Sequence, residues 1–292
     1  MRPRGYLEVG VNDGRSLTLS RVPTIAIDPE FCITSEVSCD VRLVKATSDD
    51  FFARPGCVDH LPGGVIDFGF IDGMHLSEFA YRDFMNVERL STWTSVIVFD
   101  DMLPRSAPEA ARDRYTKFWA GDVYKASLAL QRLRPDLVCI PVDTSPTGML
   151  LVLGANAADT TLRSAYDGLL AEFTAPDPQA VPTEVLQRTS SADPEKVVAS
   201  PVWADLVAAR EAGAPRDPAV YEPMRSLRGT GPVVPVVAPE PVRLRDHKPP
   251  ARVPARPPAS RKRASPRAEA VGRRSALRRR TRKLLRRIAD RL

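Results

Sequence analysis

Apolar runs alternate with amphipathic stretches through the first half of the chain. The apolar runs predict strands at 6–9, 24–27, 41–44, 65–71, 95–99, 137–141 and 149–153. The amphipathic stretches predict helices at 16–20, 48–53, 77–90 and 122–133. Ser77 and Asp122 stand at the starts of two of these helices and are expected to be their N-caps. Strands that alternate with helices in this way predict an α/β domain with a largely parallel sheet.

The strand pattern fades after residue 154. Two further helices are predicted at 160–173 and 202–211, separated by segments that contain proline. We therefore expect an α/β domain at 1–154, followed by a helical or weakly ordered extension at 155–228.

The end of the chain has a different composition. Proline and arginine dominate 229–271, which predicts a disordered, extended linker. Residues 272–292 place apolar side chains at helical spacing among ten Arg and Lys, which predicts a basic amphipathic helix. An anionic membrane surface or an acidic protein would suit this helix, although it can also be a solvated face. Nucleic acid is less favoured, because 222–292 contain no aromatic side chain on which bases could stack.

Charge is divided in the same way. Residues 241–292 contain 19 Lys and Arg against 3 Asp and Glu, whereas the rest of the chain contains 23 against 33. The net charge of +6 therefore describes the tail and not the acidic α/β domain. An acidic domain disfavours a nucleic-acid substrate, because phosphates are bound by Lys and Arg.

The chain shows no targeting or membrane-spanning pattern. No run approaches the roughly 18 apolar residues of a membrane span, and the first residues lack a signal-peptide pattern. We expect a cytoplasmic protein that the basic tail could bring to a membrane surface. The four cysteines lack paired spacing, which favours reduced thiols over disulfides or a zinc site.

The first predicted strand ends in a glycine-bearing turn within YLEVGVNDGRSL. Gly10 and Gly14 would let the backbone approach a ligand closely, and the following helix would offer free N–H groups. The same spacing also serves ordinary strand-to-helix turns. It is not the GxGxxG of dinucleotide binding, which disfavours NAD and FAD.

The next two predicted strands end in polar residues. Asp28, at the end of TIAID, is placed to accept hydrogen bonds from the ribose hydroxyls of an adenosyl cofactor, with helix capping as the alternative. Ser48 and Asp49 follow the third strand and would meet the adenine edge. A glycine turn and an acidic residue at consecutive strand ends together favour an adenosyl cofactor.

Two later strands end abruptly in carboxylates, in IDFGFIDGMH and VIVFDDML. Asp72, Asp100 and Asp101 would meet at the sheet edge where open α/β sheets bind ligands. Three carboxylates repel one another unless a cation is present, and hard oxygen ligands suit Mg²⁺, Mn²⁺ or Ca²⁺. Alternatively, one or two of them cap helices or face solvent. His75 could be a base, a ligand or a packed polar residue.

Taken together, these motifs resemble class I S-adenosylmethionine (SAM)-dependent methyltransferases of the small-molecule O-methyltransferase type, similar to methyltransferase family 24. This group includes macrolide-sugar O-methyltransferases and cephalosporin-hydroxylase-like proteins. The resemblance rests on LEVG, AIDP, FIDGMH and IVFDD, and also on GDVYKASLALQRLRPDL and SPTGMLLVLG, within residues 5–154. It implies a Rossmann-like, mostly parallel sheet of seven strands, the last of them antiparallel.

The resemblance also implies roles for the cofactor residues. Glu8, Gly10 and Gly14 would frame the methionine moiety of SAM, and Asp28 would hold its ribose.

A second implied set concerns catalysis. Asp72, Asp100 and Asp101 would hold a divalent metal, Mg²⁺ or Mn²⁺, and His75 would be the general base beside Asp72. A metal lowers the pKa of an acceptor hydroxyl and an imidazole removes its proton. A vicinal diol or a sugar hydroxyl of a small polar acceptor would suit such a site.

Other interpretations stay open. Methyltransferases of this type usually carry helical material before the first strand, so either the start is truncated or a lid comes from elsewhere. A metal-independent methyltransferase would leave Asp100 and Asp101 structural. In a different class, the domain would be a catalytically inactive scaffold that acts through its basic tail. A homo-oligomer is compatible with each of these.

Overall fold

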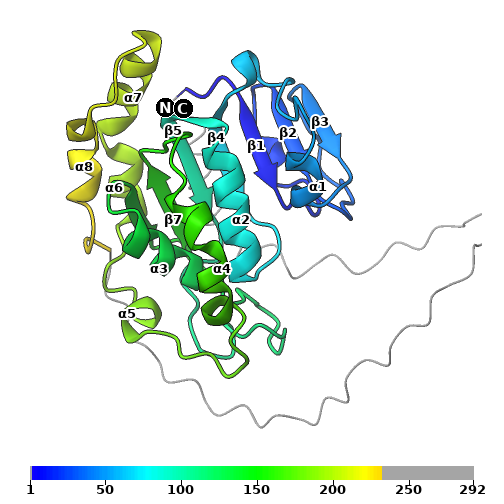
Figure 1. Cartoon of the computed structure of the whole chain (residues 1–292), viewed down its shortest axis with the longest axis vertical. Helices are drawn as coiled ribbons and strands as arrows, with labels where there is room; N and C mark the ends of the chain where they lie inside the picture. Colours follow the sequence, from blue (N-terminus) through cyan, green and yellow to red (C-terminus); the bar gives the residue numbers. More distant parts are fainter. Residues whose placement is uncertain (1, 232–292) are drawn as a thin grey trace, which may run out of the picture.

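The computed structural model describes residues 2–231, and a seven-stranded sheet forms its centre (Figure 1). The strands are β1 Tyr6–Val9, β2 Thr24–Ile27, β3 Val41–Val44, β4 Ile66–Ile71, β5 Ser91–Phe99, β6 Val138–Val142 and β7 Met149–Leu153. Their order is β3-β2-β1-β4-β5-β7-β6. Strands β1 to β5 are parallel, and β7 runs antiparallel to both of its neighbours. The predicted α/β sheet with an antiparallel last strand is confirmed.

The register of the parallel strands brings their ends to one level. Val9 at the end of β1 pairs with Ile27 of β2 and with Ile71 of β4, and Ile71 pairs with Phe99 of β5. The residues that follow these four positions therefore emerge together at the carboxyl edge of the sheet. Ligands bind at this edge in open α/β folds.

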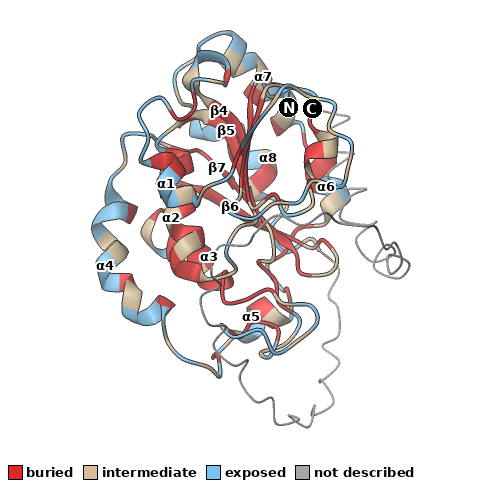
Figure 2. Cartoon of the chain, turned by 90° about the vertical axis from the view of Figure 1, so that its right-hand side faces the viewer, coloured by how far each residue is buried: buried red, intermediate tan, exposed pale blue. Residues whose placement is uncertain are grey.

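Helices cover one face of the sheet. They are α1 Ser48–Phe52, α2 Ser77–Glu88, α3 Tyr124–Leu133 and α4 Thr161–Phe173. A buried cluster joins Leu7 and Ile25 of the sheet to Phe84 of α2 and Leu130 of α3. Figure 2 shows α2 and α3 largely buried, whereas α4 leaves much of its surface exposed.

Short helices cover part of the other face. The remaining helices are α5 Thr183–Leu186, α6 Pro194–Ala199, α7 Val202–Glu211 and α8 Glu222–Arg225, with 3-10 helices η2 Pro62–Gly64 and η3 Pro218–Tyr221. Val202, Leu206 and Met224 share a buried cluster with Val98 and Val138 of the sheet. Helices α6, α7 and α8 thus pack on this face of the sheet and share its core, because strands that are apolar on both faces need cover on both.

The connection from β1 to β2 differs from its prediction. The helix expected at 16–20 is reduced to a 3-10 helix, η1 Leu17–Leu19. Phe31, Ile33 and Val37 of the segment after β2 pack against the sheet's second cluster on that side. Coil between β2 and β3 therefore covers part of this face of the sheet.

The two predicted N-caps are wrong. Leu76 occupies the N-cap position of α2 and Val123 that of α3, and neither side chain caps its helix. Instead, the backbone N–H of Ser77 donates to the carboxylate of Asp122 at 2.9 Å. Asp122 thus satisfies the start of a helix 45 residues away in the chain.

Two further predictions concern segments of other kinds. Among the described residues, no helix combines the length and apolar character needed to cross a bilayer. The predicted basic helix at 272–292 and nearly all of the linker at 229–271 lie outside the described residues.

Candidate active site

A cavity of about 740 Å³ opens at the carboxyl edge of the sheet. The residues expected at the site that line it are Gly10, Asp28, Ser48, Asp49, Asp72, His75, Asp100 and Asp101. Segments after five consecutive strands, together with the loops at 114–119 and 144–148, contribute to its wall. The register of the sheet therefore gathers most of the expected site residues around one space.

The turn after β1 brings the backbone close to the end of β4. Gly10 has a φ of +89°, and a Cβ added to it would lie 1.9 Å from the carbonyl oxygen of Asp72. Only glycine permits this approach and this backbone conformation together. Gly10 is thus required for β1 and β4 to share one edge of the cavity.

Glu8 and Gly14 do not line the cavity. Glu8 is fully buried, and its carboxylate accepts hydrogen bonds from Tyr6 Oη at 2.8 Å and from Ser16 Oγ. Burial raises the pKa of Glu8 to about 8. Gly14 closes the turn, because its N–H donates to the carbonyl of Val11 at 2.9 Å. Glu8 reaches the cavity only through Ser16, which does line it.

Asp28 is fixed at the end of β2 by two backbone donors. The N–H of Asn12 donates to Oδ2 at 2.8 Å, and the N–H of Glu30 donates to Oδ1 at 2.6 Å. A carboxylate oxygen can accept more than one hydrogen bond, so both oxygens keep capacity for ribose hydroxyls. The carboxylate of Asp28 is therefore held in place and can still accept further hydrogen bonds.

Ser48 and Asp49 stand at the start of α1 and face partners on α2. Arg82 holds Asp49 through Nη2–Oδ2 at 2.6 Å and Nε–Oδ1 at 3.2 Å. Ser48 hydrogen-bonds the carboxyl group of Asp83, which also lines the cavity. Burial raises the pKa of Asp83 to about 7, and among the described side chains its Oδ1 has no hydrogen-bond partner. Sequence patterns gave Asp83 no role, because it lies in the middle of an amphipathic helix.

Asp72, His75 and Asp101 form the closest group of potential metal ligands. His75 Nε2 lies 3.5 Å from Asp72 Oδ1, and His75 Nδ1 lies 3.1 Å from Asp101 Oδ2. One ligand atom from each of the three residues lies within 4.8 Å of the others. Asp100 is next to this group, and its Oδ1 accepts the N–H of Asp101 at 2.9 Å. The expected set of three aspartates is therefore joined by His75, with Asp100 at its margin.

Burial and mutual repulsion change the acidity of this group. Burial and the charges of Asp101 and Asp72 raise the pKa of Asp100 well above its ordinary value. Burial also raises the pKa of Asp101, to about 6, although the charge of His75 acts in the opposite direction. Burial lowers the pKa of His75, but the hydrogen bond and charge of Asp72 and the charge of Asp101 prevail and raise it to about 9. The group is thus a histidine held between acidic side chains whose charges act on its pKa.

Residues 104–120, here called the lid segment, connect β5 to α3 beside this group. Trp119 stacks on His75 with ring centroids 5.0 Å apart and an angle of 12° between the rings. His75 Nδ1 lies 2.9 Å from the carbonyl oxygen of Trp119. Gly121 has a φ of +64°, and a Cβ added to it would lie 1.7 Å from the carbonyl oxygen of His75. The lid segment is therefore in direct contact with the predicted catalytic histidine.

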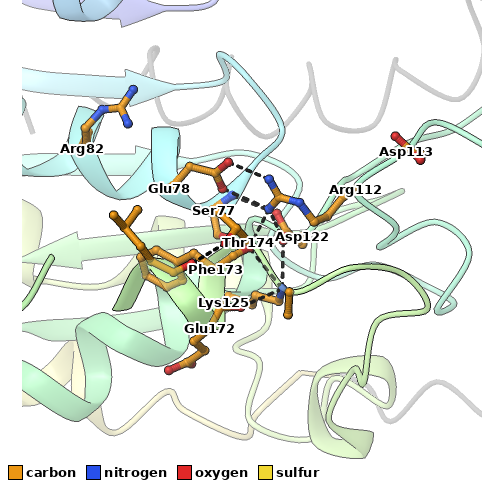
Figure 3. A network of polar contacts seen from close by, with 12 residues as sticks. Ser77, Glu78, Arg82, Arg112, Asp113, Asp122, Lys125, Glu172, Phe173 and Thr174 are labelled. Atoms are coloured by element: carbon orange, nitrogen blue, oxygen red, sulfur yellow. Dashed lines mark hydrogen bonds and ion pairs between the residues drawn. The ribbon is translucent and has the colours of Figure 1, made fainter. Parts of the chain in front are cut away.

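A network of ionic contacts anchors the lid segment to three helices (Figure 3). Arg112 donates to Glu78 of α2 at 2.6 and 3.0 Å and to Asp122 at 2.8 Å. Asp122 also accepts from Lys125 of α3 at 2.9 Å. Arg112 and Lys125 both donate to the carbonyl of Phe173 at the end of α4. No periodic pattern in the sequence pointed to this network.

No protein-family model and no curated protein matches the chain. The comparison with solved structures did find matches. The O-methyltransferase TomG from Streptomyces achromogenes, involved in tomaymycin synthesis and solved in complex with SAM, is 20% identical with a TM-score of 0.40. The match covers 53% of this chain and 74% of that one. An O-methyltransferase from Bacillus cereus, in complex with SAH, is 15% identical with a TM-score of 0.37, covering 52% and 74%. The N-methyltransferase NodS from Bradyrhizobium japonicum is 14% identical with a TM-score of 0.32, covering 53% and 86%.

The chain's own topology gives the stronger result. Its seven mostly parallel strands and its antiparallel β7 are the arrangement that the sequence resemblance implied, and the cavity lies at the carboxyl edge where the acidic strand ends were expected to meet. The chain therefore has the fold of the class I SAM-dependent methyltransferases.

Proposed function

We propose that the protein transfers a methyl group from SAM to a hydroxyl of a small acceptor, with the help of a divalent cation. One observation carries the proposal: Asp28, Asp72 and Asp101 follow strands that end in register, and all three line one cavity with Gly10. An acidic cavity also suits the positive sulfonium of the methyl donor.

Binding of SAM is assigned to the half of the cavity near β1, β2 and α1. The turn at Gly10 would meet the methionine moiety, and Asp28 would accept the ribose hydroxyls. Ser48 and Asp49 would lie at the adenine edge.

The residues at the other end fit a divalent cation. Asp72 and Asp101 offer carboxylate oxygens within reach of each other, which suits Mg²⁺ or Mn²⁺. Burial and repulsion together raise the pKa of Asp100, and a positive charge there would relieve the repulsion. When bound, such an ion would supply polarisation of the acceptor oxygen and lower the pKa of its hydroxyl.

His75 is assigned as the base. A carbonyl only accepts hydrogen bonds, so the contact with Trp119 keeps a hydrogen on Nδ1 and leaves Nε2 to take the proton. The carboxylates of Asp72 and Asp101 hold the pKa of His75 at about 9, and a compensating positive charge between them would bring it down. The acceptor oxygen then forms its bond to the methyl carbon as the sulfur–carbon bond breaks, leaving S-adenosylhomocysteine.

The proposal is tested by calorimetric titration of S-adenosylhomocysteine into the full chain, with and without Mg²⁺. We expect binding in both cases and separate binding of Mg²⁺ that Asp72→Ala removes. Turnover lost with a chelator and restored by Mg²⁺ would distinguish this enzyme from a metal-independent methyltransferase. Absence of any binding of S-adenosylhomocysteine would contradict the proposal. Binding without turnover of any acceptor would favour the inactive scaffold.

A further inference from the structure

Charge is distributed unevenly around the cavity. Carboxylates follow the strand ends, whereas Arg114 and Lys117 line the cavity from the lid segment. Both of these cationic side chains belong to exposed residues, so they stand at the rim. The floor of the cavity is therefore acidic and one side of its rim is basic.

The two cations of the rim are not committed to carboxylates. Arg15, which also lines the cavity, is paired with Asp13 at 2.5 Å. Among residues 2–231, by contrast, neither Arg114 nor Lys117 forms an ion pair, and Arg114 Nη2 donates only to the carbonyl of Lys117 at 3.3 Å. Two uncompensated cations beside an acidic cavity point to an anion that completes this side.

Carboxylates on or near the lid segment already have other partners. Glu109 is held by Arg105 at 2.5 Å, and Asp113 accepts from Tyr115 Oη at 3.1 Å. Asp177 accepts backbone N–H groups of the lid segment. An acidic group from a ligand is thus the partner that Arg114 and Lys117 would gain.

Large apolar side chains line the same cavity as the basic rim and His75. Met74 is 53% exposed and Phe118 is 42% exposed, although both are large and hydrophobic. Both line the cavity, as does Trp119, whose ring lies flat on His75. Large exposed apolar side chains gathered at a cavity are typical of a surface that binds an apolar ligand.

We propose that the acceptor is a hydroxylated aromatic compound that carries an anionic group, a carboxylate or a phosphate. Its ring would lie against Met74 and Phe118, with the hydroxyl toward His75 and the anion at Arg114 and Lys117. This inference rests on the proposed methyl transfer and narrows its acceptor class. A neutral sugar would leave both cations without a partner.

The test compares catechols that differ in charge, using the full chain with SAM and Mg²⁺. The probes are protocatechuate, dihydroxybenzylphosphonate, the neutral protocatechuamide and the cationic dopamine. We expect the KM of one or both anions to be about fivefold below that of the amide, with dopamine the weakest, because an exposed ion pair contributes up to about 1 kcal/mol. The carboxylate and phosphonate arms show which anion the rim prefers. Added salt should reduce the preference.

Variants of Arg114 and Lys117 test whether these two residues cause the preference for anionic probes. Arg114→Gln and Lys117→Gln should each raise the KM for the preferred anion about twofold, because the two cations share the fivefold preference, with kcat and the KM for the amide unchanged. Lys196→Gln is the matched control, because Lys196 is exposed on α6 and does not line the cavity.

Calorimetry with the same probes separates this inference from the proposed methyl transfer. It measures binding without turnover, in the presence and absence of S-adenosylhomocysteine. Equal binding of all four probes, preference for the amide or dopamine, or no binding of either anion at millimolar concentration would overturn the inference. Anion-selective binding without methylation would support the rim and count against the proposed methyl transfer alone.

Discussion

The floor and the lid segment of the cavity are built on different principles. The floor consists of the carboxylates that follow strand ends in register, and backbone N–H groups donate to both carboxylate oxygens of Asp28. The lid segment is a loop held by the anchor of Arg112 and by the stacking of Trp119 on His75, and it exposes cations and apolar side chains. A sheet can hold like charges close together, whereas a loop can change its side chains without disturbing the sheet. We therefore assign cofactor chemistry to the floor and choice of acceptor to the lid segment.

The largest effect is expected for the floor when Asp72 is replaced. Asp72→Asn should lower turnover about a thousandfold, because it removes a proposed metal ligand and the partner of His75. Affinity for S-adenosylhomocysteine should change little. The measurement is the initial rate of Asp72→Asn. The control is Asp113→Asn, because Asp113 is an exposed carboxylate of the lid segment. Unchanged turnover in Asp72→Asn would remove the metal assignment.

The next prediction concerns Glu8, whose buried carboxyl group is expected to stabilise the folded protein in its protonated form. The pKa of Glu8 is about 8 in the folded protein and about 4.5 in an unfolded chain, so the folded state retains a proton that the unfolded state loses. The free energy of unfolding should therefore fall as pH rises through this window, by about 3 kcal/mol between about pH 5 and pH 8.

Glu8→Gln should abolish this component. Urea unfolding of the parent chain, Glu8→Gln and the exposed control Glu36→Gln at several pH values measures it. A difference between the parent and Glu8→Gln that does not vary with pH would contradict the assignment.

Arg112 tests the lid segment's anchor. Arg112→Met should lower the free energy of unfolding by about 2 kcal/mol, because Glu78 and Asp122 lose a partner in a mostly buried network. The KM for the acceptor should rise while the affinity for S-adenosylhomocysteine stays the same. This result would show that the lid segment acts on the acceptor and not on the cofactor. Arg132→Met is the matched control, since its ion pair with Glu172 is exposed and should contribute less than about 1 kcal/mol. If Arg112→Met lost affinity for S-adenosylhomocysteine as much as for the acceptor, the lid segment and the floor would not be independent.

The smallest effect is expected at the ribose position. Asp28→Ala should weaken binding of S-adenosylhomocysteine about tenfold, because two hydroxyls lose a charged acceptor while the backbone donors of Asn12 and Glu30 are freed to bind water. Calorimetry on this variant and on Glu30→Ala gives the comparison, since Glu30 contributes only its backbone N–H. Equal affinities in the two variants would show that Asp28 does not meet the ribose.

Most strands could be predicted because each is a local apolar run. The bounds expected for β1, β2, β3 and β7 are those observed. The start of β5 was placed at Ser95, yet the strand begins at Ser91, because Ser91 pairs with Ile66 of β4. Polar residues such as Thr92 and Thr94 carry no apolar signal, so pairing with a neighbour decided that boundary.

The candidate site could be predicted in part. Carboxylates that follow parallel strands meet at one edge, so the approach of Asp72 to Asp101 followed from the strand pattern. The position of Glu8 beneath the cavity did not follow, because alternation along β1 does not show which polar side chain a later turn will cover. Trp119 was missed because its partner, His75, lies 44 residues away in the chain.

The sequence by itself determined the alternation of strands and helices and the acidic strand ends, because both depend on residues close together in the chain. Tertiary structure alone decided that Asp122 caps the start of α2, that Arg112 anchors the lid segment and that Arg114 and Lys117 reach the cavity. These contacts join residues far apart in the chain. They have no period in the sequence, and their geometry exists only once the sheet and its helices have packed.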